Sequence, residues 1–172
     1  MEGLEQALLD LQRLTEQLRR ECPWDRDQTA RTIVPHTVEE AYEVADAALA
    51  GDDAKLLDEL GDLLFQVYFL SLLLSEHGNG DLASVARGVH AKLVRRHPHV
   101  FGDVEAKTAT RVKENWDRIK REQEGREGVF HDVASALPSL LYARKVQQRA
   151  KSAPPFNCDS IESASFLSFT RM

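Results

Sequence analysis

The sequence has 172 residues, of which 42% are hydrophobic and 29% are charged. This length and composition are typical of one globular domain, alone or with part of a second, and exclude a largely disordered protein. Acidic residues outnumber basic residues by 28 to 22, and the resulting net charge of −6 disfavours general nucleic-acid binding because it repels the phosphate backbone.

The predicted secondary structure is a series of amphipathic helices, because apolar residues recur at three- and four-residue steps along most of the chain. In chain order, the predicted helices run over about Gly3–Glu21, from between Thr32 and Thr37 to Ala50, and over about Ala54–Glu76, Leu82–Arg96, Thr110–Glu124 and Leu137–Lys151. Helix-breaking residues separate them, namely Pro23, Gly51, Gly78–Gly80, Pro98 and Gly125. No segment shows the period-two alternation of a strand, so the predicted fold class is all-α, an antiparallel helical bundle.

The chain changes character after Gly125. Gly125 and Gly128 flank a short charged linker, and Ser152–Pro155 precedes a tail rich in serine and phenylalanine. The expected divisions are a helical domain over residues 1–125, a linker and helix over 126–151, and a divergent, flexible tail over 152–172.

Three features predict a cytoplasmic protein that binds no membrane. The longest apolar stretch, Leu63–Leu74, is interrupted by Gln66 and Ser71 and is shorter than the roughly 20 residues of a membrane-spanning helix. The first residues lack the basic start, apolar run and cleavage site of a secretion signal. Cys22 and Cys158 are far apart and match neither a disulfide framework nor a zinc site.

Two pairs of acidic residues are the most informative feature of the sequence. Glu40 and Glu43 share a face of the second predicted helix, and Glu59 and Asp62 repeat this spacing on the third. The short connection between the helices predicts antiparallel packing, which can bring both pairs together. Four converging carboxylates repel one another without a counter-charge, and an all-oxygen set suits Mg²⁺ or Mn²⁺. The spacing therefore predicts a divalent-metal site.

The same residues also fit a purely structural role. Thr37–Glu40 matches a capping box in which Glu40 satisfies the start of a helix, and acidic faces exposed to solvent are common. A di-iron site is disfavoured, because neither acidic pair contains the histidine of a Glu-x-x-His motif, although His36 lies four residues before Glu40. Spacing alone leaves the metal site and the exposed acidic face as alternatives.

A basic cluster, Lys92, Arg95 and Arg96, closes the fourth predicted helix. Facing a metal–carboxylate site, these cations would suit a polyphosphate, whereas alone they could simply complement the helix dipole. Trp116 lies on a polar helix, where it either stacks on a nucleobase or anchors the helix to the bundle. The sequence has no P-loop motif, which excludes a nucleotide site of that class.

Four motifs in a fixed order together resemble the MazG family of nucleoside triphosphate pyrophosphohydrolases. The resemblance covers about residues 4–151 and is carried by Cys22–Asp25, Glu39–Val44, Glu59–Leu64 and Lys92–Phe101. It implies a dimerising helical bundle of the all-α NTP pyrophosphatase type. It also implies Mg²⁺-dependent hydrolysis of NTPs and dNTPs between the α and β phosphates, giving NMP and pyrophosphate.

The resemblance also implies roles for individual residues. The implied Mg²⁺ ligands are Glu40, Glu43, Glu59 and Asp62, with Mn²⁺ as a possible substitute. The implied substrate contacts are Lys92, Arg95 and Arg96 to the phosphates and Trp116 to the nucleotide. Catalysis by a metal-activated water follows from this arrangement. We expect Glu43 to take part in catalysis, with Glu39 as the base that orients the water, because Glu39 lies four residues before Glu43 on a neighbouring face.

The last part of the chain departs from the family pattern. Leu137–Ala150 resembles the segment that leads into a second MazG domain in full-length bacterial relatives, but the carboxylate motif of that domain is missing here. We expect an enzyme of nucleotide-pool house-cleaning or stress response; the alternative is a non-catalytic nucleotide-binding or dimerisation module. Either way we expect a homodimer or a dimer of dimers, because apolar faces such as Val67–Leu74 would be exposed in a monomer.

Overall fold

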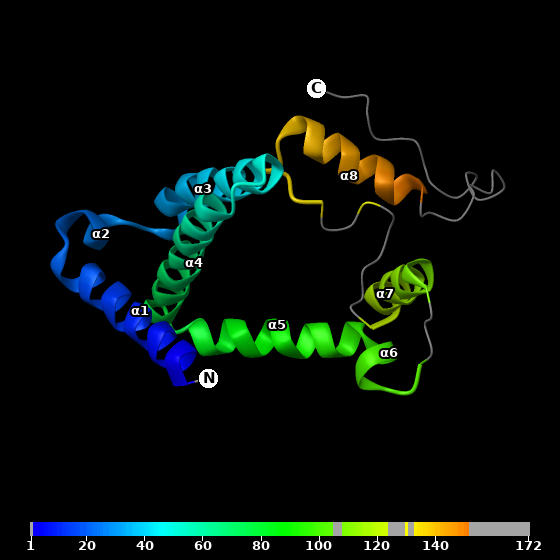
Figure 1. Ribbon diagram of the computed structural model, residues 1–172, viewed down its shortest axis with the longest axis horizontal. Helices are drawn as coiled ribbons and strands as arrows, with labels where there is room; N and C mark the ends of the chain where they lie inside the picture. The colour runs from blue at the N-terminus through cyan, green and yellow to red at the C-terminus, as the bar shows by residue number, and fades with distance from the viewer. Residues whose placement is uncertain (1, 105–107, 124–129, 131–132, 152–172) are drawn as a thin grey trace, which may run out of the picture. The chain divides into compact units, whose positions relative to one another are not determined.

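The computed structural model of the chain describes residues 2–104, 108–123, 130 and 133–151 (Figure 1). Every regular element in these ranges is a helix, which confirms the predicted all-α class. In chain order the helices are α1 (Glu2–Glu21), α2 (Pro23–Asp27), α3 (Ala30–Ala50), α4 (Asp53–Glu76), α5 (Leu82–Arg96), α6 (Pro98–Phe101), α7 (Ala109–Gln123) and α8 (Ser139–Lys151). The chain divides into two compact units, residues 1–95 and 96–172, and each is described by itself. None of the described helices combines the length and the apolarity that a bilayer crossing requires.

The first unit is built on a helical hairpin formed by α3 and α4. Gly51 follows α3 in the left-handed conformation, with φ of 70°, which glycine adopts without the strain that a side chain would add. The Asp52 carboxylate then caps α4 by accepting a hydrogen bond of 3.0 Å from the Lys55 backbone N–H. α3 and α4 pack closely against each other, and α1 packs on α2 and α4 (Figure 1). The hairpin thus places the two helices that carry the acidic pairs side by side.

The largest cluster of buried apolar side chains in this unit lies towards the open end of the hairpin. Ile33 near the start of α3 and Phe69 and Leu73 near the end of α4 are each at most 5% exposed. Phe65 and Leu70 are partly buried against them. Because interdigitated side chains resist sliding, this core helps to fix the axial register of α3 against α4.

α3 begins earlier than the predicted start between Thr32 and Thr37. Thr29 caps the helix: its hydroxyl accepts a hydrogen bond from the Thr32 N–H (3.3 Å), and the Thr32 hydroxyl accepts one from the Thr29 N–H (2.9 Å). This reciprocal cap stabilises a helix start despite Pro35, which lies inside α3 and removes one backbone donor. The alternative capping box at Thr37 and Glu40 is therefore wrong, because both residues lie well inside the helix.

α2 and α6 are short helices that the periodicity did not predict. They contain five and four residues, too few to show a repeating apolar face. Each begins with a proline, Pro23 or Pro98, whose fixed φ and missing N–H suit the first helical turn.

The predicted bounds of the other helices agree with the structure to within two residues at each end for α1, α4, α5, α7 and α8. Residues 125–126 and the tail over 152–172 lie outside the described residues, so the predicted domain boundaries stay predictions.

Candidate metal centre and nucleotide site

The α3–α4 hairpin brings together three of the four predicted metal ligands. One carboxylate oxygen from each of Glu40, Glu43 and Glu59 lies within 4.8 Å of the others. Glu59 is buried, at 8% exposed, whereas Glu40 and Glu43 are half-buried. Asp62 lies one turn after Glu59 on α4, is exposed, and falls outside this group of three. Oxygen donors from two adjacent helices therefore form a partly enclosed acidic cluster.

The electrostatics of the cluster favour a bound cation. Burial raises the pKa of Glu40, and the negative charges of Asp62 and Glu43 raise it further. Asp62 therefore interacts with the cluster although it lies outside the closest group. Burial also raises the pKa of Glu59, followed by the charge of Glu43, while the Lys55 ammonium 3.8 Å away acts in the opposite direction. A divalent cation would offset both the burial of these carboxylates and their mutual repulsion, and a set of carboxylate oxygens fits Mg²⁺ or Mn²⁺.

The raised pKa values predict how the stability of the metal-free protein depends on pH. When a carboxyl pKa is higher in the folded than in the unfolded state, the folded state binds more protons between the two values. The free energy of unfolding then falls as the pH rises through this window. We expect Glu59→Gln, which removes one such group, to weaken this dependence near the raised pKa of Glu59. Calorimetric melting of both proteins in EDTA over a pH series measures the difference.

Added Mg²⁺ provides the matching control. The metal competes with protons for the same oxygens, so the stabilisation of the wild-type protein by Mg²⁺ should shrink as the pH is lowered. Equal pH dependence of the metal-free wild-type and Glu59→Gln proteins would contradict the assigned electrostatics.

Two sets of contacts beside the cluster were not predicted from the sequence. Lys55 is a counter-charge to Glu59, and its position four residues earlier on the same helix was the available signal. His36 contacts the exposed Trp24 edge to face, with ring centroids 5.8 Å apart, and its Nδ1 lies 3.8 Å from a carboxylate oxygen of Glu39. Glu39 itself is exposed and is not part of the group of three oxygens.

The second unit places cations around Trp116. The Lys120 ammonium lies 4.6 Å from the centroid of the indole and the Arg96 guanidinium lies 5.9 Å from it, while the His97 ring is 5.7 Å away. Arg96 is buried and Trp116 is half-buried, with its indole nitrogen lacking a hydrogen-bond partner among the described residues. Lys120 was also missed, although it lies one turn after Trp116. Indole contacts with cations of this kind are attractive, so Trp116 helps to order this unit.

The predicted basic residues thus fall on both units. Lys92 and Arg95 are exposed near the end of α5 in the first unit, whereas Arg96 belongs to the second.

Comparison with known proteins identifies the family. The family described as MazG nucleotide pyrophosphohydrolase domain matches residues 28–101, which include the acidic α3–α4 hairpin. Residues 28–101 match the MazG family. The match also includes the basic cluster at the end of α5, whereas Trp116 lies beyond it.

Two curated relatives match most of this chain. A nucleoside triphosphate pyrophosphohydrolase of Escherichia coli K12 is 41% identical over 152 residues, which are 87% of this chain and 57% of the relative. A nucleoside triphosphate pyrophosphohydrolase/pyrophosphatase MazG of Thermotoga maritima is 35% identical over 131 residues, which are 75% of this chain and 50% of the relative. This chain therefore spans between half and three fifths of the length of these two relatives.

A solved MazG structure agrees with the fold. The crystal structure of a MazG-related protein from Thermotoga maritima superposes with a TM-score of 0.57 at 26% sequence identity. The superposition covers 66% of this chain and 98% of the other. The helical architecture described above is thus shared with a MazG-related protein.

Proposed function

We propose that this chain is a nucleoside triphosphate pyrophosphohydrolase that cleaves NTPs and dNTPs between the α and β phosphates, giving NMP and pyrophosphate. The observation that carries the proposal is the convergence of the Glu40, Glu43 and Glu59 oxygens within 4.8 Å on the hairpin. The names of the Escherichia coli and Thermotoga maritima relatives support the same activity.

In this proposal the acidic residues of the hairpin hold Mg²⁺, which Mn²⁺ can replace. Its ligands are Glu40, Glu43, Glu59 and Asp62. Bound there, the metal would polarise the phosphate oxygens and lower the pKa of a water ligand. Glu39, which is exposed beside the cluster, acts as the base that orients the attacking water. Glu43 takes part in catalysis by keeping the charge of the acidic cluster close to that water.

The basic residues and Trp116 bind the substrate in this proposal. The exposed Lys92 and Arg95, together with Arg96, contact the phosphates and offset the charge of the departing pyrophosphate. Trp116 contacts the nucleotide, for which its half-buried indole offers a stacking face and a nitrogen donor without a partner among the described residues.

Self-association into a homodimer or a dimer of dimers belongs to the same proposal. Val85, Val89 and Leu93 recur at four-residue steps along α5, and each is about two fifths exposed. Such a stripe on a helix is typical of a surface that a second protein covers. Sedimentation equilibrium at micromolar concentration should show a dimer or tetramer; a monomer alone would contradict this part of the proposal.

In this proposal the activity serves nucleotide-pool house-cleaning or a stress response in the cytoplasm. A second function rests on one observation, that the chain covers 57% of the Escherichia coli relative. Under that alternative the chain is a nucleotide-binding or dimerisation module without turnover.

Identification of the products tests the proposal directly. The purified chain is incubated with a panel of NTPs and dNTPs and Mg²⁺, and the products are separated by chromatography. NMP with pyrophosphate, absent in EDTA, supports the proposed reaction and ranks the substrates. NDP with phosphate contradicts it, and Mg²⁺-dependent binding of nucleotide without turnover supports the module instead.

A further inference from the structure

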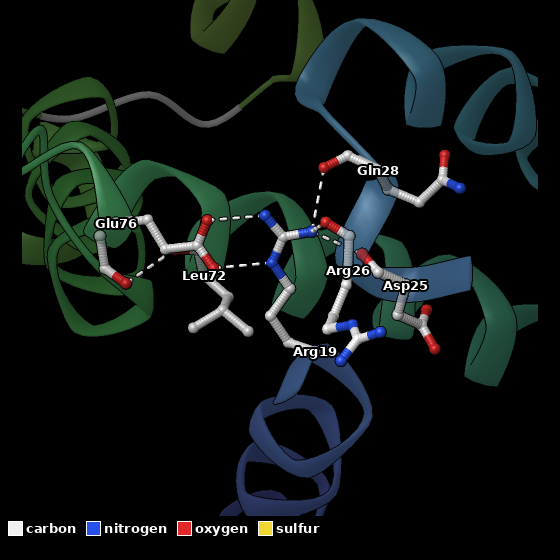
Figure 2. A network of polar contacts seen from close by, with 7 residues as sticks. Arg19, Asp25, Arg26, Gln28, Leu72 and Glu76 are labelled. Atoms are coloured by element: carbon white, nitrogen blue, oxygen red, sulfur yellow. Dashed lines mark hydrogen bonds and ion pairs between the residues drawn. The ribbon is translucent and has the colours of Figure 1, made fainter. Parts of the chain in front are cut away.

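Arg19 on α1 makes a polar network outside the acidic cluster (Figure 2). Its guanidinium pairs with the Glu76 carboxylate through two hydrogen bonds of 2.7 and 2.8 Å. It also donates to the backbone carbonyl of Asp25 and, at 3.0 Å each, to the carbonyls of Arg26 and Gln28. The hydrogen bond and charge of Arg19 lower the pKa of Glu76, as expected for a strong ion pair. One half-buried side chain therefore joins three segments of the first unit.

Two partners of Arg19 lie beside the ends of the two helices that carry the carboxylates, whereas Asp25 and Arg26 belong to α2. Gln28 immediately precedes Thr29, the N-cap of α3, and Glu76 is the last residue of α4. The opposite end of the hairpin is closed by the turn at Gly51. Arg19 therefore links the end of α4 to the segment that leads into α3 (Figure 2). The hairpin is thus tied near both ends, and the acidic cluster lies between them.

The acidic cluster needs such a tie because its own charges oppose it. Glu40 and Glu43 on α3 face Glu59 on α4, and without a cation their repulsion pushes the two helices apart. A slip of one residue along a helix displaces a ligand by about 1.5 Å, which is enough to spoil a metal site.

We propose that Arg19 is a positioning residue for the acidic cluster. By clamping the open end of the hairpin, it keeps the carboxylates of Glu43 and Glu59 close enough to share one divalent cation. The inference rests on the proposed function for the identity of that ligand. Arginine is required at this position, since the planar guanidinium serves a carboxylate and three carbonyls at once, whereas a lysine ammonium has three donors and no fork.

The test is Mn²⁺ binding to the whole chain without nucleotide, measured by electron paramagnetic resonance. Arg19→Lys keeps the charge and removes the fork, and should weaken Mn²⁺ affinity about tenfold, the scale of a lost supporting contact in a metal site. The matched control is Arg13→Lys on the same helix, because Arg13 forms an exposed ion pair with Asp10. This control should change the affinity by less than about twofold.

Glu76→Gln is a second variant that should also weaken Mn²⁺ affinity. It keeps the test decisive if Arg19→Lys does not fold. The variant that combines Arg19→Lys and Glu76→Gln should bind Mn²⁺ about as weakly as Arg19→Lys alone, because both changes break the same network. A lower melting temperature with unchanged Mn²⁺ affinity in both variants would overturn the inference, since Arg19 would then only stabilise the fold.

The wild-type protein separates this inference from the proposed function. If wild-type protein binds no Mn²⁺, or binds it equally well after Glu43→Gln, the metal site of the proposed function fails and this inference falls with it. If wild-type protein binds Mn²⁺ through Glu43 but Arg19→Lys binds it as tightly, only the positioning role of Arg19 is overturned.

Discussion

Glu43→Gln is expected to lower kcat/KM for NTP hydrolysis at least about a hundredfold, because it removes a charged ligand from the centre of the acidic cluster. Glu43 is the residue that both other members of the cluster face: its charge raises the pKa of Glu40 and of Glu59. Glutamine keeps the shape of the side chain and one oxygen, so the loss should come from charge. Steady-state kinetics with Mg²⁺, together with Mn²⁺ titration, measure it.

The same variant should melt at a higher temperature than the wild-type protein in EDTA, because repulsion within the metal-free cluster is relieved. Asp46→Asn is the matched control, since Asp46 is an exposed acid one turn further along α3 and outside the cluster. It should leave kcat/KM within about twofold, as surface charges contribute little. Equal activity of the Glu43→Gln and wild-type proteins would contradict the proposed metal centre.

Phe69→Ala should destabilise the first unit by about 4 kcal/mol, the scale of a large aromatic side chain lost from a packed core. Phe69 is 1% exposed, packs with Ile33 and Leu73, and lies beneath the Arg19 guanidinium at 5.9 Å. Its loss leaves a cavity between α3 and α4 and removes the stacking surface of the clamp. Urea unfolding followed by circular dichroism measures the change in the free energy of unfolding.

Leu57→Ala is the control for this prediction, because Leu57 lies on the same helix with 76% of its surface exposed. It should change the free energy of unfolding by less than about 0.5 kcal/mol. If Phe69→Ala costs no more than Leu57→Ala, Phe69 does not belong to the core that sets the register of the hairpin.

The local part of the site could be predicted from sequence because it depends on one helix at a time. The three-residue spacing of Glu40 and Glu43, and of Glu59 and Asp62, places each pair on one helical face whatever surrounds it. The carboxylate chemistry then indicated a divalent cation. The predicted start of α3 lies at least two residues late, because a proline inside a helix is usually unfavourable and the cap at Thr29 that stabilises this start was not recognised.

The sequence by itself determined the helical class, most helix ends, the acidic and basic motifs and the resemblance to MazG. All of these follow from contacts within a few residues or from residue order. Only the tertiary structure decided that Glu40, Glu43 and Glu59 converge while Asp62 stays exposed. It also decided that Arg19 links α1 to α4 and to the segment just before α3. The physical reason is that the register between two helices is set by side-chain packing and ion pairs between residues distant in sequence, such as Arg19 and Glu76, which no local periodicity encodes.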